Sequence, residues 1–129
     1  MGVITEAHRE LIREVGLCYV ATASSDGVPN LSPKGSITVV DDDHLAFADI
    51  MSPGTRRNLQ QNPNVAIFVC KPEKYQGFQF KGKAEVTSEG ELYDSFVTMI
   101  KEKKLPVPPP KHAVKVKLEE VRALGEAPA

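Results

Sequence analysis

Short β-prone segments, mostly joined by tight turns, constrain the fold of this 129-residue chain more than any other feature. Strands are predicted over residues 17–23, 30–40, 44–49, 65–70, 75–87 and 114–118. The pair Asp26-Gly27 favours a hairpin turn, because glycine readily adopts positive φ. Residues 41–43, all aspartate, predict a second turn, so the first three strands should form an antiparallel meander. A small barrel is the economical way to hide the edges of six such strands. The sequence therefore predicts a mainly β fold, a small closed barrel of about six strands with short helices between them.

Three helices are predicted between or before these strands. Apolar residues at helical spacing over 4–15 end at Gly16, which is typical of a helix stop. A second helix begins at Ser52, which can cap it, and Pro53 suits the first helical position. The third begins at residues 88–91, which fit a capping box, and carries Phe96 on its apolar face.

Length and composition fit one domain spanning residues 1–129. The formal net charge is −1, so no basic excess points to nucleic acid. No signal-peptide pattern or membrane-length apolar run is seen, and a cytoplasmic location is expected. Cys18 and Cys70 are expected to be reduced, buried thiols, unless their strands prove to be neighbours and allow a disulfide.

The first candidate site is the predicted helix start, with Ser52, Thr55, Arg56 and Arg57. Unpaired backbone N–H groups, the helix dipole and the two guanidinium groups all favour a phosphate there. The alternative is a capped surface helix with solvated arginines. The local pattern alone leaves both interpretations open.

The second candidate site is Ser32-Pro33-Lys34-Gly35, which is an unusual centre for a strand. Pro33 removes a hydrogen-bond donor from the ladder, and Gly35 allows a ligand or another backbone to approach. A bulged edge strand would explain the same residues. The segment 75–82 interleaves aromatic residues with Gln76 and Gln79, which could stack on and hydrogen-bond a heterocycle, or could line a barrel.

Common catalytic patterns are missing from the sequence. His8, His44 and His112 have no metal-ligand spacing with each other or with the cysteines. No nucleotide-binding glycine loop or nucleophile motif is present. We identify no catalytic carboxylate pair, and no metal is expected.

Taken together, four segments carry a family resemblance: residues 19–30, 32–35, 55–66 and 80–85. Their order and spacing are similar to the pyridoxamine 5′-phosphate oxidase-like family of FMN-binding split barrels, from about Leu11 to Leu124. The resemblance implies a six-stranded antiparallel split β-barrel with short flanking helices, and FMN in a groove between two subunits of a homodimer. It implies that Lys34 contacts the cofactor, and that Thr55, Arg56 and Arg57 bind its phosphate.

The chain also departs from the vitamin B6 oxidases of that family. Val39 stands where they carry a second basic residue, and Gly77 where they carry a flavin-contacting glutamine. Their C-terminal segment over the substrate has no counterpart, so no useful oxidation of pyridoxamine or pyridoxine phosphate is expected. The resemblance is closer to the short, general flavin-nucleotide-binding members.

The function expected from the resemblance is a redox flavoprotein, either an oxidoreductase or an electron carrier, with a small-molecule or protein redox partner. FMN would supply the chemistry, which accounts for the missing acid–base residues. The alternatives are a non-catalytic module that stores or senses a flavin, deazaflavin or haem, and a true pyridoxamine 5′-phosphate oxidase.

Overall fold

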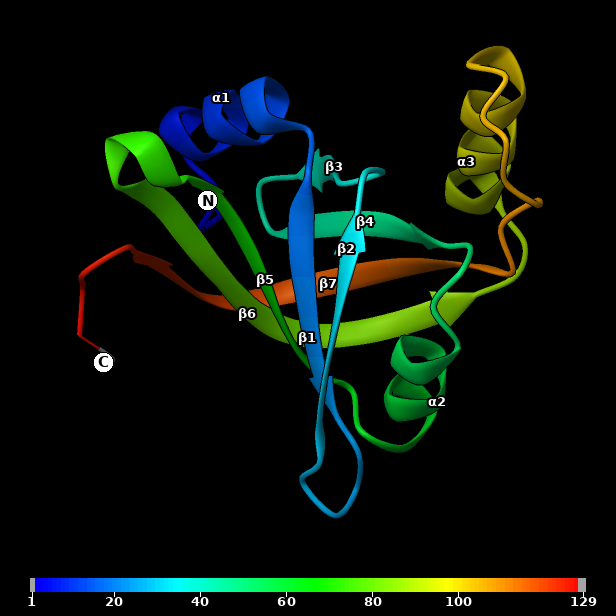
Figure 1. The fold of residues 1–129 in the computed structure, drawn as a ribbon, viewed down its shortest axis with the longest axis horizontal. Coiled ribbons are helices and arrows are strands. Elements are labelled where there is room, and N and C mark those ends of the chain that lie inside the picture. The colour runs from blue at the N-terminus through cyan, green and yellow to red at the C-terminus, as the bar shows by residue number, and fades with distance from the viewer. Residues whose placement is uncertain (1, 128–129) are drawn as a thin grey trace.

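A computed structural model describes residues 2–127 as a strongly curved antiparallel sheet with helices at its ends (Figure 1). The helices are α1 (Glu6–Val15), α2 (Pro53–Gln61) and α3 (Glu91–Glu102), with a short 3-10 turn, η1 (Pro72–Lys74). The strands are β1 (Cys18–Ala23), β2 (Pro29–Lys34), β3 (Thr38–Asp41), β4 (His44–Asp49), β5 (Asn64–Lys71), β6 (Gln76–Thr87) and β7 (His112–Ala123).

The two edges of the sheet come from a single stretch of sequence. The strand order is β2-β1-β5-β6-β7-β4-β3, so β2 lies at one edge and β3 at the other. Only residues 35–37 separate these two strands along the chain. The sheet therefore has to curl until its edges meet, which produces the split barrel that the family resemblance implies.

The predicted strand over 30–40 is thus two strands, which raises the count from six to seven. The expected meander of the first three strands is wrong for the same reason. β2 pairs with β1, whereas β3 pairs with β4, and the two hairpins end at opposite edges of the sheet. The backbone leaves the ladder directly after Lys34, at Gly35 and Ser36.

The long strand β6 is irregular at Gly82. The register between β6 and β7 shifts between Lys81 and Gly82. A Cβ atom at Gly82 would lie 2.0 Å from the carbonyl oxygen of Lys117. Only glycine allows the two backbones to approach this closely.

Two apolar clusters lie beneath the helices. The main core fills the barrel with fully buried side chains, among them Leu45, Phe47, Ile67, Val69, Phe80 and Val116. Leu11 and Ile12 of α1 close this core at one end. A smaller cluster contains Phe96 of α3 and the alanines of β4 and β7. The small alanine side chains of the strands let α3 pack directly on the sheet.

Helix capping differs from the prediction at two places. Gly90, in positive φ, is the cap residue of α3, and no side chain hydrogen-bonds there, so the capping box expected at 88–91 is wrong. A capping box exists instead at α1, where Thr5 and His8 bond each other's backbone N–H groups. His8 also packs edge-on against Phe78, with ring centroids 4.4 Å apart.

Both cysteines are free thiols. Their strands β1 and β5 are neighbours, but Cys18 points into the core while Cys70 lies on the outer face. They face opposite sides of the sheet and cannot pair. None of the helices formed by residues 2–127 is both long and apolar enough to cross a membrane.

Candidate functional site

A buried carboxylate, Asp49, lies at the centre of the candidate site. It is the last residue of β4, and only 1% of its surface is exposed. Ser52 Oγ donates to Asp49 Oδ1 at 2.9 Å, and Arg56 Nε donates to Oδ2 at 2.9 Å. His112 Nδ1 lies 3.1 Å from the same Oδ2 atom. A buried charge is costly unless it is paired and hydrogen-bonded. Asp49 therefore holds β4, the start of α2 and the start of β7 in one arrangement.

Lys34 brings a buried positive charge to the same place from β2. Its Nζ atom contacts Ser52 Oγ, and it lies 5.8 Å from the centre of the Phe47 ring. Burial lowers the pKa of Lys34, and the charge of Asp49 acts in the opposite direction. The strand that sequence analysis singled out thus places its lysine against the start of α2.

Thr55 ties α2 to the neighbouring strand. Its hydroxyl lies 2.8 Å from Ser32 Oγ and accepts a hydrogen bond from Asn30 Nδ2 at 3.1 Å. One turn further along α2, Asn58 Nδ2 donates to Thr22 Oγ1 at 3.0 Å. These buried bonds fix the orientation of α2 against β1 and β2.

The start of α2 retains unused hydrogen-bond donors. Ser52 does not cap the helix as expected, because its hydroxyl is engaged by Lys34 and Asp49. No acidic residue lies in the first turn. Arg57 is exposed, and it makes no ion pair within residues 2–127. Arg56 uses Nε for Asp49, which leaves its terminal nitrogens for another acceptor. This end of the helix is suited to an anion.

An apolar cavity of about 460 Å³ adjoins Lys34. One wall is formed by residues 32–36, and the others come from the end of β4, from α3 and from the connector after it. The apolar side chains that line it are Ile50, Met51, Met99, Leu105 and Val107. The site thus combines a polar, cationic helix end with an adjacent apolar cavity, as ligand sites commonly do.

The structure brings most of the predicted site residues together. Ser32 contacts Thr55 and Lys34 contacts Ser52 where β2 faces α2, and Arg56 joins them through Asp49. Gly35 lines the adjoining apolar cavity. Pro33 lines the apolar cavity, and Arg57 follows Arg56 on the helix. The list of predicted residues lacked Asp49 and His112. Asp49 could have been noticed as the single acidic residue closing the apolar run 45–48, directly before the helix start.

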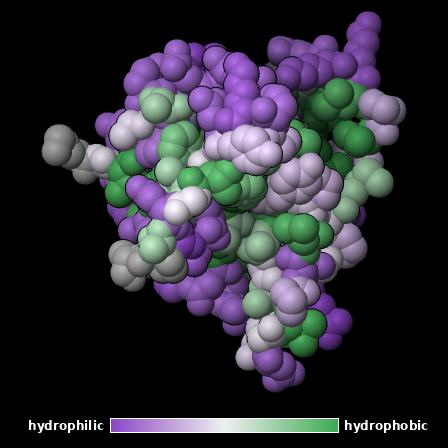
Figure 2. All heavy atoms as spheres, turned by 60° about the vertical axis from the view of Figure 1, so that its left-hand side comes forward, coloured by the Kyte–Doolittle hydropathy of each residue, from purple (hydrophilic) through white to green (hydrophobic). Residues whose placement is uncertain are grey.

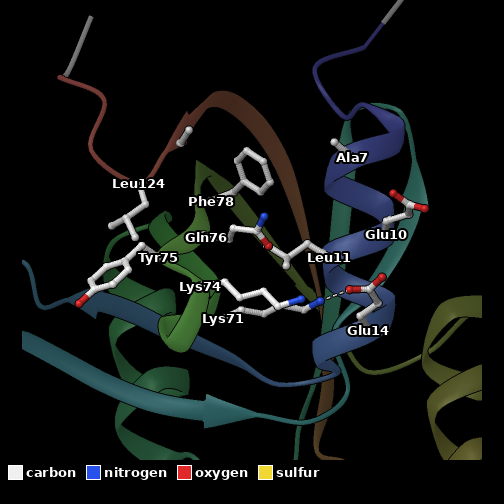
Figure 3. Close-up of a pocket in the computed structure, with 12 residues that line it drawn as sticks. Ala7, Glu10, Leu11, Glu14, Lys71, Lys74, Tyr75, Gln76, Phe78 and Leu124 are labelled. Atoms are coloured by element: carbon white, nitrogen blue, oxygen red, sulfur yellow. Dashed lines mark hydrogen bonds and ion pairs between the residues drawn. The ribbon is translucent and has the colours of Figure 1, made fainter.

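The two predicted glutamines lie elsewhere in the same chain. Gln76 lines a groove of about 510 Å³ between α1 and the β5–β6 hairpin (Figure 3). Tyr75 and Leu124 border this groove, and an ion pair between Lys71 and Glu14 spans it. Figure 2 shows this side of the molecule, where hydrophobic side chains interrupt a largely hydrophilic surface.

Gln79 belongs to the outer face of the sheet. Pairing places it beside Phe68, which in turn pairs with Tyr19, so the three side chains form a row across β6, β5 and β1. Leu31, on the same face of β2, is 67% exposed. Together these residues make a partly apolar sheet face, most exposed at Tyr19 and Leu31.

No group of three or more histidine, cysteine, aspartate or glutamate side chains able to hold a metal occurs within residues 2–127. His44, which pairs with the exposed Asp41 at 2.8 Å, lies at the opposite end of β4 from Asp49. The expectation of no metal site from the sequence remains a prediction.

Comparisons with known proteins identify relatives over almost the whole chain. Residues 4–125 match the family model described as pyridoxamine 5′-phosphate oxidase. An uncharacterized protein of Methanocaldococcus jannaschii is 35% identical over 116 residues, which cover 87% of this chain and 75% of the relative. HupZ of Group A Streptococcus is 28% identical and superposes with a TM-score of 0.85, covering 98% of each chain.

Two more distant structures share the fold. An FMN-binding protein of Syntrophomonas wolfei is 15% identical with a TM-score of 0.74, covering 93% of this chain and 90% of the other. HutZ, the haem storage protein of Vibrio cholerae, is 19% identical with a TM-score of 0.70, and the match covers 97% of this chain and 96% of HutZ. At these identities the likeness shows the fold alone.

Proposed function

Because this chain belongs to the pyridoxamine 5′-phosphate oxidase family, we propose that it is an FMN-binding redox protein, an oxidoreductase or an electron carrier. The observation that carries the proposal is the buried network of Lys34, Ser52, Asp49 and Arg56 at the uncapped start of α2. The FMN phosphate would be held there by Thr55, Arg56 and Arg57, while the Ser52 hydroxyl keeps its bonds to Lys34 and Asp49. The flavin would extend beside β2, along residues 32–35.

The charges at the site fit such a group. Lys34, Arg56 and Arg57 contribute three positive charges, and Asp49 offsets one of them. Excess positive charge at a helix start favours a phosphate, and arginine can bind it through two parallel hydrogen bonds. The bond from Arg56 Nε to Asp49 fixes the guanidinium plane, so less side-chain entropy is lost when an anion binds.

A bound flavin would supply the hydride or electron transfer, and the chain would supply binding, orientation and electrostatics. Lys34 would hold a positive charge beside the cofactor, supported by Ser52 and Asp49. The apolar cavity next to it would keep water away from the reacting atoms.

We further propose that a homodimer completes the site. A barrel of this size cannot enclose both its own core and the long FMN molecule. The partly apolar sheet face with Tyr19, Leu31 and Phe68 is a suitable surface for a two-fold contact. Gln79 lies on this face, so it would reach the cofactor of the other subunit rather than its own.

The cofactor proposal is tested by comparing FMN with riboflavin. Charge-assisted bonds to the phosphate should make FMN bind at least about tenfold more tightly. Arg57→Gln should weaken FMN binding and leave riboflavin binding unchanged, whereas the control Lys101→Gln, on the exposed side of α3, should change neither. Fluorescence titration gives both affinities, and equal affinity for the two flavins would contradict this phosphate site.

The dimer proposal is tested by light scattering on flavin-loaded protein at low micromolar concentration. A stable interface commonly buries more than about 1,000 Å². Leu31→Asp places a charge on the partly apolar sheet face and should produce monomers that have lost flavin. A monomer that keeps FMN would show that one barrel encloses the cofactor.

A second candidate function, haem binding, is favoured by the contact between His112 and Asp49. A carboxylate on one imidazole nitrogen fixes the ring and leaves the other nitrogen available to a metal. Titration with haem should then give a Soret band that His112→Ala shifts or abolishes and that His44→Ala leaves intact. If haem gives the same spectrum with His112→Ala, this candidate is wrong.

A further inference from the structure

We propose that the co-substrate of this site carries an anionic group, a carboxylate or a phosphate, which is bound by Arg13 of α1 and Lys103 at the end of α3. This proposal rests on the proposed redox function for the reaction itself, but the anion site follows from the cavities and charges alone. The anion site lies in a different part of the molecule from the phosphate site at the start of α2.

Two cavities meet at Lys103. The apolar cavity beside Lys34 has a volume of about 460 Å³, and a second crevice of about 390 Å³ lies between α1, β3 and α3. Both are lined by Gly35, Ser36, Met99 and Lys103. A ligand that enters one of them therefore reaches the wall of the other, with the lysine at the junction.

The charges along this combined space have a single sign. The second crevice is lined by Arg9, Arg13 and Lys103, and the apolar cavity adds Lys34. Neither lining contains an aspartate or a glutamate, although the chain has 17 acidic residues against 16 lysines and arginines. A cleft lined by one sign of charge attracts ligands of the opposite sign.

Two of the four cations are the best placed to bind a new anion. Arg9 is already paired with Asp42 at 2.6 Å, and Lys34 belongs to the network around Asp49. Arg13 approaches Glu6 only at 3.7 Å, and both of these side chains are mostly exposed, so that ion pair is weak. Lys103 forms no ion pair within residues 2–127.

The walls of the two cavities define the rest of the ligand. Met51, Met99, Leu105 and Val107 suit an apolar or aromatic body in the larger cavity. Ile12 and Val39 continue this lining into the crevice. The chemical class is therefore an apolar or aromatic molecule with one carboxylate or phosphate, whose body lies beside Lys34 while the anion lies at the junction.

Calorimetric titration of the full chain as purified tests this class with three probes that share one ring system. They are 2-naphthoate, 2-naphthyl phosphate and the uncharged 2-naphthamide. At least one anion should bind about tenfold or more tightly than the amide, because hydrogen bonds to charged groups are the stronger ones. The tighter of the two anions identifies the natural anionic group.

The charged residues are tested with Arg13→Gln combined with Lys103→Gln. This double variant should reduce the preference for the anion to within about threefold, since a charge-assisted bond is replaced by a neutral one. The matched control Lys101→Gln removes one charge from the same helix outside both cavities, and should keep the preference. Equal binding of anion and amide, or the same loss in the control, would overturn the proposal.

The visible spectrum and flavin titration of the same preparation decide the proposed function separately. Protein that prefers the anions but binds no flavin would retain the anion site and contradict the redox function. Protein that binds FMN but shows no preference for either anion would retain the flavin site and refute this inference.

Discussion

Of the acidic residues described above, Asp49 is the one whose replacement by the uncharged asparagine should destabilise the protein most. Asparagine is nearly the same size as aspartate, so the substitution preserves packing and changes only the charge and the hydrogen bonds. Oδ1 of Asp49 accepts one hydrogen bond, and Oδ2 faces both Arg56 Nε and His112 Nδ1. An amide group cannot accept on its nitrogen, so at least one buried donor loses its partner.

The expected loss follows from these contacts. A buried polar group left unpaired costs about 1–3 kcal/mol, and removing one partner of a buried ion pair costs about 3–5 kcal/mol. We expect Asp49→Asn to lower the free energy of unfolding by about 3 kcal/mol. That is a large part of the roughly 5–15 kcal/mol typical of a folded domain.

Urea denaturation at fixed protein concentration measures this loss, with an unchanged m-value showing that the folded and unfolded states remain comparable. Asp42→Asn is the matched control, because Asp42 also pairs with an arginine but its side chain is 65% exposed. An exposed pair of this kind is worth less than about 1 kcal/mol. A loss below about 1 kcal/mol for Asp49→Asn, or an equal loss for both variants, would refute the reasoning.

Two further predictions concern buried titratable groups. Burial lowers the pKa of His8 below its usual value of 6.5, so the unfolded chain binds a proton at higher pH than the folded one, and stability falls as the pH drops below about 6.5. Glutamine at position 8 can still cap the helix but does not titrate. In urea denaturation, His8→Gln should therefore lose less free energy of unfolding than the parent protein when the pH falls from 6.5 to 5. An unchanged dependence of this free energy on pH would exclude His8 as the cause. Burial raises the pKa of the Cys18 thiol to about 12. In the Cys70→Ser variant, where Cys18 is the remaining thiol, the folded protein should therefore not react with Ellman's reagent at pH 8, and one thiol should react in urea. A thiol that reacts without urea would contradict this burial.

Much of the fold could be predicted because its signals are local. The Asp26-Gly27 turn and the helix stop at Gly16 each follow from what glycine allows. The division of the strand over 30–40 could not be predicted in the same way. Residues 35–37 leave the ladder because β2 pairs with β1 whereas β3 pairs with β4, and the two hairpins are joined into one sheet only through the later strands β5, β6 and β7.

The site was predicted in part for a related reason. Lys34, Thr55 and Arg56 were identified because local chemistry marked them. Asp49 and His112 were missed because they become a pair only when β4 and β7 align in register, and that alignment places the two residues opposite each other. Ser52 was assigned to helix capping, its usual local role, but its hydroxyl is engaged by Lys34 and Asp49.

The junction at residues 35–37 connects barrel closure with ligand binding. Gly35 and Ser36 border both the apolar cavity and the cationic crevice, and Ser36 Oγ accepts a hydrogen bond from the backbone N–H of Ala48 at 2.9 Å. These walls exist only when the two edges of the sheet have come together. Edge strands and loops are the elements that open at low energy cost, so opening of this junction would remove the ligand site while the core around Phe47 and Phe80 stayed folded. Ligand affinity would then depend on the fraction of molecules whose barrel is closed, and mutations that loosen β3 would weaken binding without touching a ligand.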